Sequence, residues 1–118
     1  MMKRSLILVL SLLMLVLCIP ALAESTDWNY DANYAILRGY DGAGGDVVVP
    51  AEIDGFTVDV IGVSVFKGDT ITSLTLPETV LELRSNAVAS CENLTSVTLP
   101  QSLVVINRMN FFSCGALT

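Results

Sequence analysis

The chain has 118 residues, with twelve Asp and Glu against six Lys and Arg, for a formal net charge of −6. A chain of this length forms one small domain with a thin core. It has no histidine, which argues against the commonest general base and a frequent metal ligand, and its acidic balance argues against binding to phosphate backbones.

Residues 1–23 have the organisation of a secretory signal peptide. Two basic residues precede an apolar run over residues 5–19, and an A-x-A cleavage site ends at Ala23. The alternative is an uncleaved membrane anchor, but the run is shorter than the roughly 20 residues of a spanning helix, and Pro20 ends it. We therefore expect a secreted or cell-surface protein whose mature chain begins at Glu24 and has no membrane span.

Residues 24–46 are predicted to form an N-terminal cap. The segment contains Trp28, Tyr30 and Tyr40, and Asp31-Ala-Asn33 separates two short alternating stretches, which is typical of a β-hairpin. Large amphipathic rings are suited to covering the open face of the repeat array that follows.

From residue 47 onward the sequence repeats itself. Residues 71–77 (ITSLTLP) return as residues 94–100 (LTSVTLP), with a period of 23. A period of this length built on L-x-x-L-x-L indicates a leucine-rich solenoid, whose units bury apolar residues by stacking on one another. An earlier copy begins at Val47 and has a period of 27, because it carries an insertion after Pro50 that we expect to form a loop. Residues 47–118 are thus predicted to form a leucine-rich repeat domain of about three coils, the last one incomplete.

Each coil is expected to contain a strand, a proline that ends it and a return segment. Pro50, Pro77 and Pro100 lack a backbone donor and therefore mark where each strand stops. The return segments at residues 85–90 and 107–112 are long enough for one or two helical turns. The predicted fold class is a repeat solenoid of mixed α/β character, dominated by short parallel strands, with short helical turns and an N-terminal β-hairpin cap.

These motifs resemble a known family. The proline-closed strands, the I-G-x-x-x-F motif that starts at Ile61, and a cysteine followed by N-L-T-S from Asn93 are similar to the BspA-type leucine-rich repeats of secreted and surface bacterial proteins. The resemblance covers about residues 34–118. It implies a right-handed solenoid, export, and work in adhesion or recognition, and it supplies no catalytic residue and no cofactor.

The last coil ends differently from the earlier copies. After Cys114, residues 115–118 stop at the point where both earlier copies continue into another strand. An open apolar face is expected at this end. The chain is therefore expected to be a fragment, a truncated gene product, or a chain that pairs through this end.

Cys91 and Cys114 occupy equivalent positions in adjacent coils. Stacked coils place such residues about 5 Å apart or somewhat farther, near the separation that a disulfide tolerates, and an exported protein permits oxidation. The alternative is a pair of free buried thiols, since the resemblance implies that this cysteine position is a small buried hydrophobe. Two cysteines without histidine are too few ligands for a structural zinc ion.

Two surface features could bind something. The outward strand positions Ser73, Thr75, Ser96 and Thr98 form a hydroxyl-lined patch, a candidate binding face without an aromatic or arginine anchor. Several carboxylates also crowd the first coil, so a calcium site is conceivable, but their spacing matches no EF-hand loop and they are ordinary turn residues. Those residues are Asp41, Asp46, Glu52, Asp54 and Asp59.

The sequence thus favours a non-catalytic, secreted or cell-surface recognition or adhesion module for an unknown protein or glycan ligand. No metal or other cofactor is expected. Nucleic acid is not an expected partner, because cleavage of the leader leaves four basic residues against twelve acidic ones, a net charge of −8. The alternatives are the scaffold portion of an exported enzyme, or a truncated repeat fragment without independent function.

Overall fold

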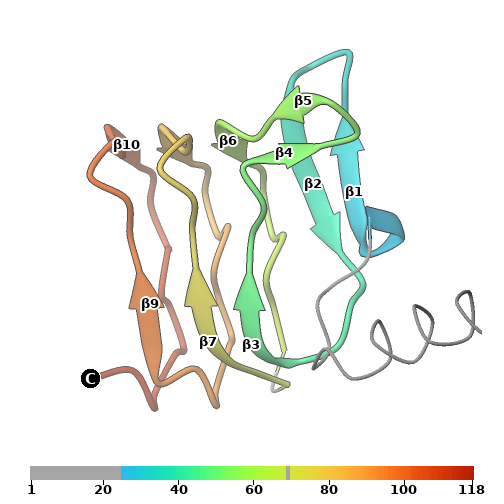
Figure 1. Ribbon diagram of the computed structural model, residues 1–118. Helices are drawn as coiled ribbons and strands as arrows, with labels where there is room; N and C mark the ends of the chain where they lie inside the picture. The colour runs from blue at the N-terminus through green and yellow to red at the C-terminus, as the bar shows by residue number, and fades with distance from the viewer. Residues whose placement is uncertain (1–24, 69) are drawn as a thin grey trace, which may run out of the picture.

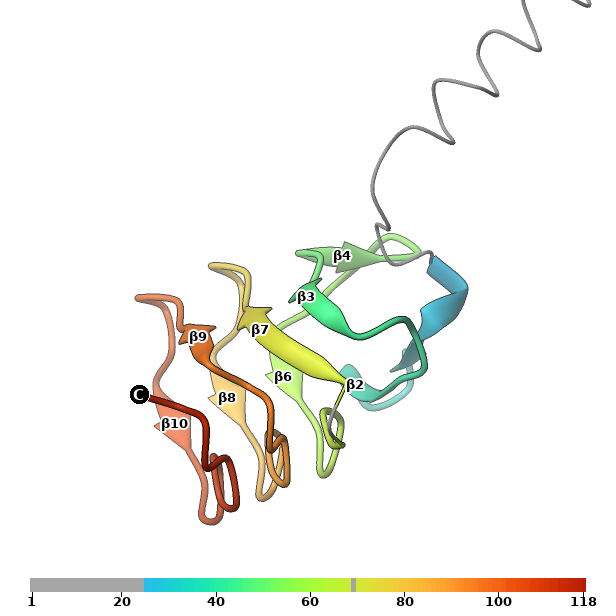
Figure 2. The ribbon, with the colours of Figure 1, turned by 90° about the horizontal axis from the view of Figure 1, so that it is seen from below.

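The computed structural model describes residues 25–68 and 70–118. Short strands stack in three successive coils beside an N-terminal hairpin, and two sheets form two sides of the stack (Figures 1 and 2). The predicted signal peptide, residues 1–23, lies outside the described residues.

The first sheet contains one strand from each coil. Its parallel strands are β3 (Gly45–Val48), β7 (Ile71–Thr75) and β9 (Ser96–Thr98). Leu74 lies opposite Val97 in the next coil and opposite Val47 in the coil before. These two pairings correspond to the periods of 23 and 27 predicted from the sequence. Both periods are therefore registers of one ladder, and the solenoid prediction is confirmed.

The second sheet runs along the return side of the coils. Its strands are β1 (Trp28–Asp31), β2 (Ile36–Tyr40), β6 (Val60–Ile61), β8 (Glu82–Leu83) and β10 (Val105–Ile106), in that order across the sheet. Ile61 pairs with Leu83, and Leu83 pairs with Ile106. The side chains of Ile61 and Leu83 are fully buried, because each is covered by a neighbouring strand on either side.

The helical turns predicted at residues 85–90 and 107–112 are wrong. Among the described residues the only helical element is the 3₁₀ turn η1 (Ser25–Asp27), so the fold is a β-solenoid without α-helix. Asn86 and Ser90 have φ values of 58° and 55°, which an α-helix does not accommodate. Their N–H groups instead donate to the next coil, to carbonyls 3.3 and 2.8 Å away. Bonding between coils replaces the bonding within a segment that a helix needs.

The N-terminal segment forms the antiparallel hairpin of β1 and β2. Trp28, in β1, is buried; its ring centroid is 4.5 Å from that of Tyr40 and 6.3 Å from that of Phe66. Because Phe66 belongs to the first coil, aromatic packing joins the hairpin to the repeats. β2 also pairs with β6 in parallel, through Leu37 and Ile61.

The insertion in the first coil is a second hairpin rather than an irregular loop. Its strands are β4 (Glu52–Ile53) and β5 (Phe56–Thr57). Asp54 and Gly55 connect them with φ values of 51° and 84°, the left-handed conformation that a two-residue hairpin turn requires. The Phe56 ring stacks on Tyr30 at 5.7 Å, so the insertion packs on the N-terminal hairpin.

A single apolar cluster runs through the stack and includes Trp28, Leu37, Phe66, Leu83 and Leu94. Gly62 lies against β2, where its N–H donates to the Leu37 carbonyl at 2.8 Å. A Cβ atom at Gly62 would stand 2.7 Å from the Leu37 carbonyl oxygen, which explains the glycine at this position of the first copy only.

Candidate binding surface

The outward face of the β3-β7-β9 sheet brings together the four hydroxyl residues selected from the sequence. Ser73 lies opposite Ser96, and Thr75 opposite Thr98, on adjacent parallel strands. All four side chains are partly or fully exposed, because alternate residues of each strand point away from the core. They form two short rows that run across the coils.

Each row continues onto β3, through two residues that were not selected from the sequence. Asp46 lies opposite Ser73, whose hydroxyl donates a 2.5 Å hydrogen bond to the Asp46 carboxylate. Val48 lies opposite Thr75, and its side chain is 58% exposed. The 27-residue period was the signal that could have found both, since it aligns residues 46 and 48 with residues 73 and 75.

This surface offers hydroxyl donors and acceptors, one carboxylate and one exposed apolar side chain. Such groups can bond the backbone of an extended peptide or the hydroxyls of a sugar. None of the six positions carries an aromatic ring or an arginine, the usual anchors of a tight interface. Thr95 directly precedes β9. Its hydroxyl donates to the Thr72 carbonyl at 3.0 Å and therefore stabilises the stacking of the coils.

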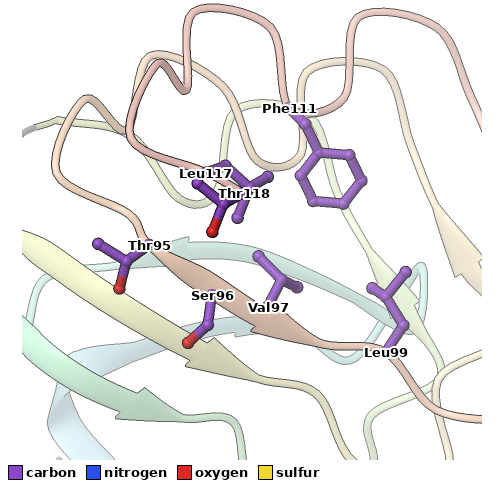
Figure 3. Close-up of a pocket in the computed structure, with 7 residues that line it drawn as sticks. All are labelled: Thr95, Ser96, Val97, Leu99, Phe111, Leu117 and Thr118. Atoms are coloured by element: carbon purple, nitrogen blue, oxygen red, sulfur yellow. The ribbon is translucent and has the colours of Figure 1, made fainter.

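A groove of about 400 Å³ lies in the last coil, beside β9. Val97 and Leu99 line one side of it, and Phe111 and Leu117 line the other (Figure 3). Leu99 occupies the position that Leu76 holds one coil earlier, yet Leu99 is 40% exposed and Leu76 only 3%. The two side chains differ in exposure because the last coil covers Leu76, whereas no further coil covers Leu99 among the described residues.

A smaller hollow of about 200 Å³ lies beside Gly62 and is lined in part by Arg38 and Arg84. Each guanidinium already has an acidic neighbour. Arg38 is 2.7 Å from Asp31 and Arg84 is 3.7 Å from Glu82. The Arg38 hydrogen bond is the main reason that the pKa of Asp31 lies below its usual value. The hollow is therefore not a concentrated positive site.

Cys91 and Cys114 are both buried, and in the structure both are free thiols. The Cys91 thiol donates to the Phe66 carbonyl at 3.5 Å, and the Cys114 thiol to the Phe112 carbonyl at 3.7 Å. Burial raises the pKa of the Cys91 thiol to about 11, and the neighbouring Cys114 adds to the rise. At neutral pH the Cys91 sulfur is protonated and is a poor nucleophile.

The raised pKa of Cys91 predicts a loss of stability in alkaline solution. A thiol whose pKa is about 11 when folded and 9.0 in the reference state stabilises the fold fully below about pH 9. Between about pH 9 and 11 this contribution should disappear, at a cost of roughly 1–2 kcal/mol. Urea unfolding under reducing conditions, at several pH values, would measure it. Cys91→Ala should lack this component and keep only the tyrosine component above about pH 10, and an unchanged pH profile would contradict the prediction.

The acidic residues of the first coil do not gather into a metal site. Within residues 25–68 and 70–118, no three His, Cys, Asp or Glu side chains lie close enough to hold an ion. Asp54, for example, serves the β4–β5 turn. In the same part of the chain, no helical segment has the length and apolar character that crossing a membrane requires.

Comparison with known proteins agrees with this architecture. Residues 53–118 match the model of the BspA type leucine-rich repeat region (6 copies). A crystal structure of a leucine-rich repeat protein from T. pallidum is similar to the chain, with a TM-score of 0.73 and 25% sequence identity. The similarity covers 82% of this chain and 48% of the T. pallidum chain, so this chain spans about half the length of that protein. No curated protein sequence matches the chain.

The matched residues contain most of the β4–β5 insertion, the strands β6 to β10, Cys91 and Cys114, and they make up more than half of the sequence. The same residues carry the 23-residue ladder register, the fully buried apolar rows and the inter-coil hydrogen bonds. The chain belongs to the BspA-type leucine-rich repeat family.

Proposed function

We propose that this chain is a non-catalytic, secreted or cell-surface recognition module that binds a protein or glycan ligand through the outward face of β3, β7 and β9. Membership of the family indicates a protein-interaction module, since leucine-rich repeat proteins of this kind are generally non-catalytic binding proteins and are typically surface-exposed or secreted in bacteria. To this general role the proposal adds secretion, adhesion and glycan binding.

The observation that carries the proposal is the two rows of partly or fully exposed hydroxyls on one sheet. Ser73, Thr75, Ser96 and Thr98 are held in register by the ladder, and on β3 and β7 the inward residues Val47 and Leu74 behind them are buried. A surface fixed in this way loses little conformational entropy when a ligand binds. An extended, weakly featured face of this kind suits an extended ligand with many hydrogen-bonding groups.

The proposed organisation of the chain supports export. We propose residues 1–23 as a cleaved signal peptide, residues 24–46 as an N-terminal cap and residues 47–118 as the repeat domain. The apolar run before Ala23 and the acidic surface of the remaining chain support this division. A disulfide between Cys91 and Cys114 stays a prediction, and the mass of the exported protein after denaturing alkylation without reductant would test it.

The binding proposal is tested by presenting the purified protein to a panel of extracellular matrix proteins and glycans. Thr75→Lys places a long charged side chain at the centre of the sheet and should weaken any binding at least about tenfold. Thr57→Lys, at an exposed threonine of β5, is the matched control and should change affinity by less than about twofold. Absence of binding across the panel by a folded sample would count against the proposal, and equal effects of both variants would place the site elsewhere.

A further inference from the structure

The strand β3 has an unpaired edge at the start of its sheet. The strand order is β3-β7-β9, and no strand of residues 25–68 or 70–118 lies beyond β3 (Figure 1). The segment that directly precedes β3 is present in the structure and pairs elsewhere, because β2 lies beside β6 in the other sheet. The N-terminal hairpin therefore extends one of the two sheets and leaves the edge of β3 without a strand.

The backbone groups on this edge belong to Asp46 and Val48. On the opposite side of β3, the Val49 N–H donates to the Thr75 carbonyl at 2.9 Å. Successive residues of a strand direct their N–H and C=O groups to alternate sides, so Val47 shares the side of Val49, whereas the groups of Asp46 and Val48 point away from β7. Unpaired backbone groups in a row pair with an added extended strand.

The side chains beside this edge are a carboxylate and an apolar group. Asp46 is exposed and Val48 is 58% exposed, and both lie on the outward face, two residues apart. Asp46 is the only charged residue of β3, β7 and β9. The exposed Asp41 and Glu52 precede and follow β3 in the chain. The basic residues of the described part lie in other segments, and they are Arg38, Lys67, Arg84 and Arg108. The charge at this edge therefore favours a basic ligand.

We infer that the ligand at this edge is an extended peptide that adds to β3 as a further strand, with a basic residue beside Asp46 and an apolar residue beside Val48. Residues two apart in a strand share a face, so the recognised pattern is a basic and an apolar residue separated by one position. This peptide belongs to the ligands of the proposed function, on which the inference rests, because its side chains would extend the same outward face by one strand.

Two other occupants fit this edge less well. A glycan lacks the alternating N–H and C=O groups that pair with the edge of a strand. A second copy of the chain would bring both Asp46 carboxylates to one contact, between two molecules that each carry a net charge of −6. Like charges on neighbouring strands are destabilising, and a charged residue on an edge strand discourages pairing between copies.

The test is the binding of a synthetic peptide to the purified protein. The full chain is expressed with its leader and used in the form the host produces, its N-terminus being determined by mass spectrometry. The probe is a capped peptide long enough to span β3, in which lysine and valine alternate at every second position with threonine between them. This pattern fits either strand direction. Calorimetry at low salt should detect binding, and the same peptide with glutamate in place of lysine should bind at least about tenfold more weakly.

N-methylation of the probe tests the backbone pairing. Only alternate residues of an added strand direct their N–H groups to β3. One probe is methylated at its lysines and valines and another at its threonines, and only one of the two should lose binding, at least about tenfold. Loss with the lysines and valines would report an antiparallel strand, and loss with the threonines a parallel one. Equal binding by both methylated probes would overturn the inference.

Variants of the protein test the edge itself. Val48→Pro removes a donor that points away from β7, and proline is tolerated on an edge strand. It should weaken the lysine peptide at least about fivefold, and far-UV circular dichroism should show that the fold is retained. Asp46→Lys should make the glutamate peptide the tighter ligand. Glu92→Lys is the matched control, since Glu92 is exposed in the second coil and the charge change is the same, and it should preserve the preference for lysine.

Four outcomes would count against the peptide. A folded protein that binds no probe would overturn the inference, and so would binding that neither Val48→Pro nor Asp46→Lys alters. A dimer that Val48→Pro dissociates would show that a second copy occupies the edge. If Thr75→Lys weakens the binding of a panel ligand and Val48→Pro does not, the added strand is wrong while binding through the outward face stands.

Discussion

Replacing Phe66 with alanine is expected to lower the free energy of unfolding by about 3–5 kcal/mol. The Phe66 side chain is 1% exposed, and its ring centroid is 6.3 Å from that of Trp28 and 6.0 Å from that of Tyr40. Its backbone also forms a bridge with Val88 of the second coil. The ring therefore joins the N-terminal hairpin to the repeats, and its removal leaves a cavity where neighbouring backbones are held by the ladder. Small domains are stable by only about 5–15 kcal/mol, so much of the stability would be lost.

Phe112→Ala is the matched control for this prediction. Phe112 is 54% exposed, and the hydrogen bonds that it accepts from the Ser90 N–H and the Cys114 thiol involve only its backbone carbonyl. Its removal should cost less than about 1 kcal/mol. Urea unfolding followed by far-UV circular dichroism measures both variants. Equal losses would mean that Phe66 does not occupy the centre of the core.

The ladder register of the first sheet could be predicted because repetition and burial act together. Leu74 and Val97 hold equivalent positions in two similar segments, and a shift of one residue would turn every apolar side chain of the strand toward solvent. The same reasoning predicted the period of 27 for the first coil, although the insertion that lengthens it forms a hairpin.

The return side of the coils could not be predicted in the same way. β6, β8 and β10 are two residues long, and a strand of that length has no periodicity to distinguish it from a helical turn. Left-handed backbone recurs in every coil at two equivalent positions. The first is Ser64, Asn86 and Met109, and the second is Gly68, Ser90 and Ser113. Serine and methionine seldom adopt this conformation, so only Gly68 and Asn86 carried a signal in the sequence.

The candidate binding face was predicted in part, for a similar reason. Its hydroxyl residues fall in the two regular coils, where the alignment is plain. Asp46 and Val48 fall in the irregular coil, and their membership of the same rows depends on a ladder that crosses a register shift at Gly45. The pairing between strands decides which side chains gather on a surface. This pairing is hardest to predict from the sequence where the repeats differ in length.

Replacing Trp28 with alanine is the second change with a large expected effect, about 3–5 kcal/mol of unfolding free energy. Trp28 is 7% exposed and its ring centroid lies 4.5 Å from that of Tyr40. The loss of its ring would expose Phe66 and the side of the first coil on which the hairpin packs. Because the coils of a solenoid are stabilised by their neighbours, an unprotected first coil should weaken the whole stack. Urea unfolding followed by circular dichroism measures the effect.

Tyr34→Ala provides the comparison within the same hairpin. Tyr34 lies in the turn, is 70% exposed, and contacts the Arg38 guanidinium at 5.4 Å, so its removal should cost less than about 1 kcal/mol. In the unmodified protein, Trp28 is the only tryptophan, and its fluorescence reports on the hairpin and its packing against the first coil. If the hairpin stabilises the coils, fluorescence and circular dichroism should give the same urea midpoint. A fluorescence transition at lower urea, with the coils still folded, would show that the hairpin detaches independently and that the repeats do not depend on it.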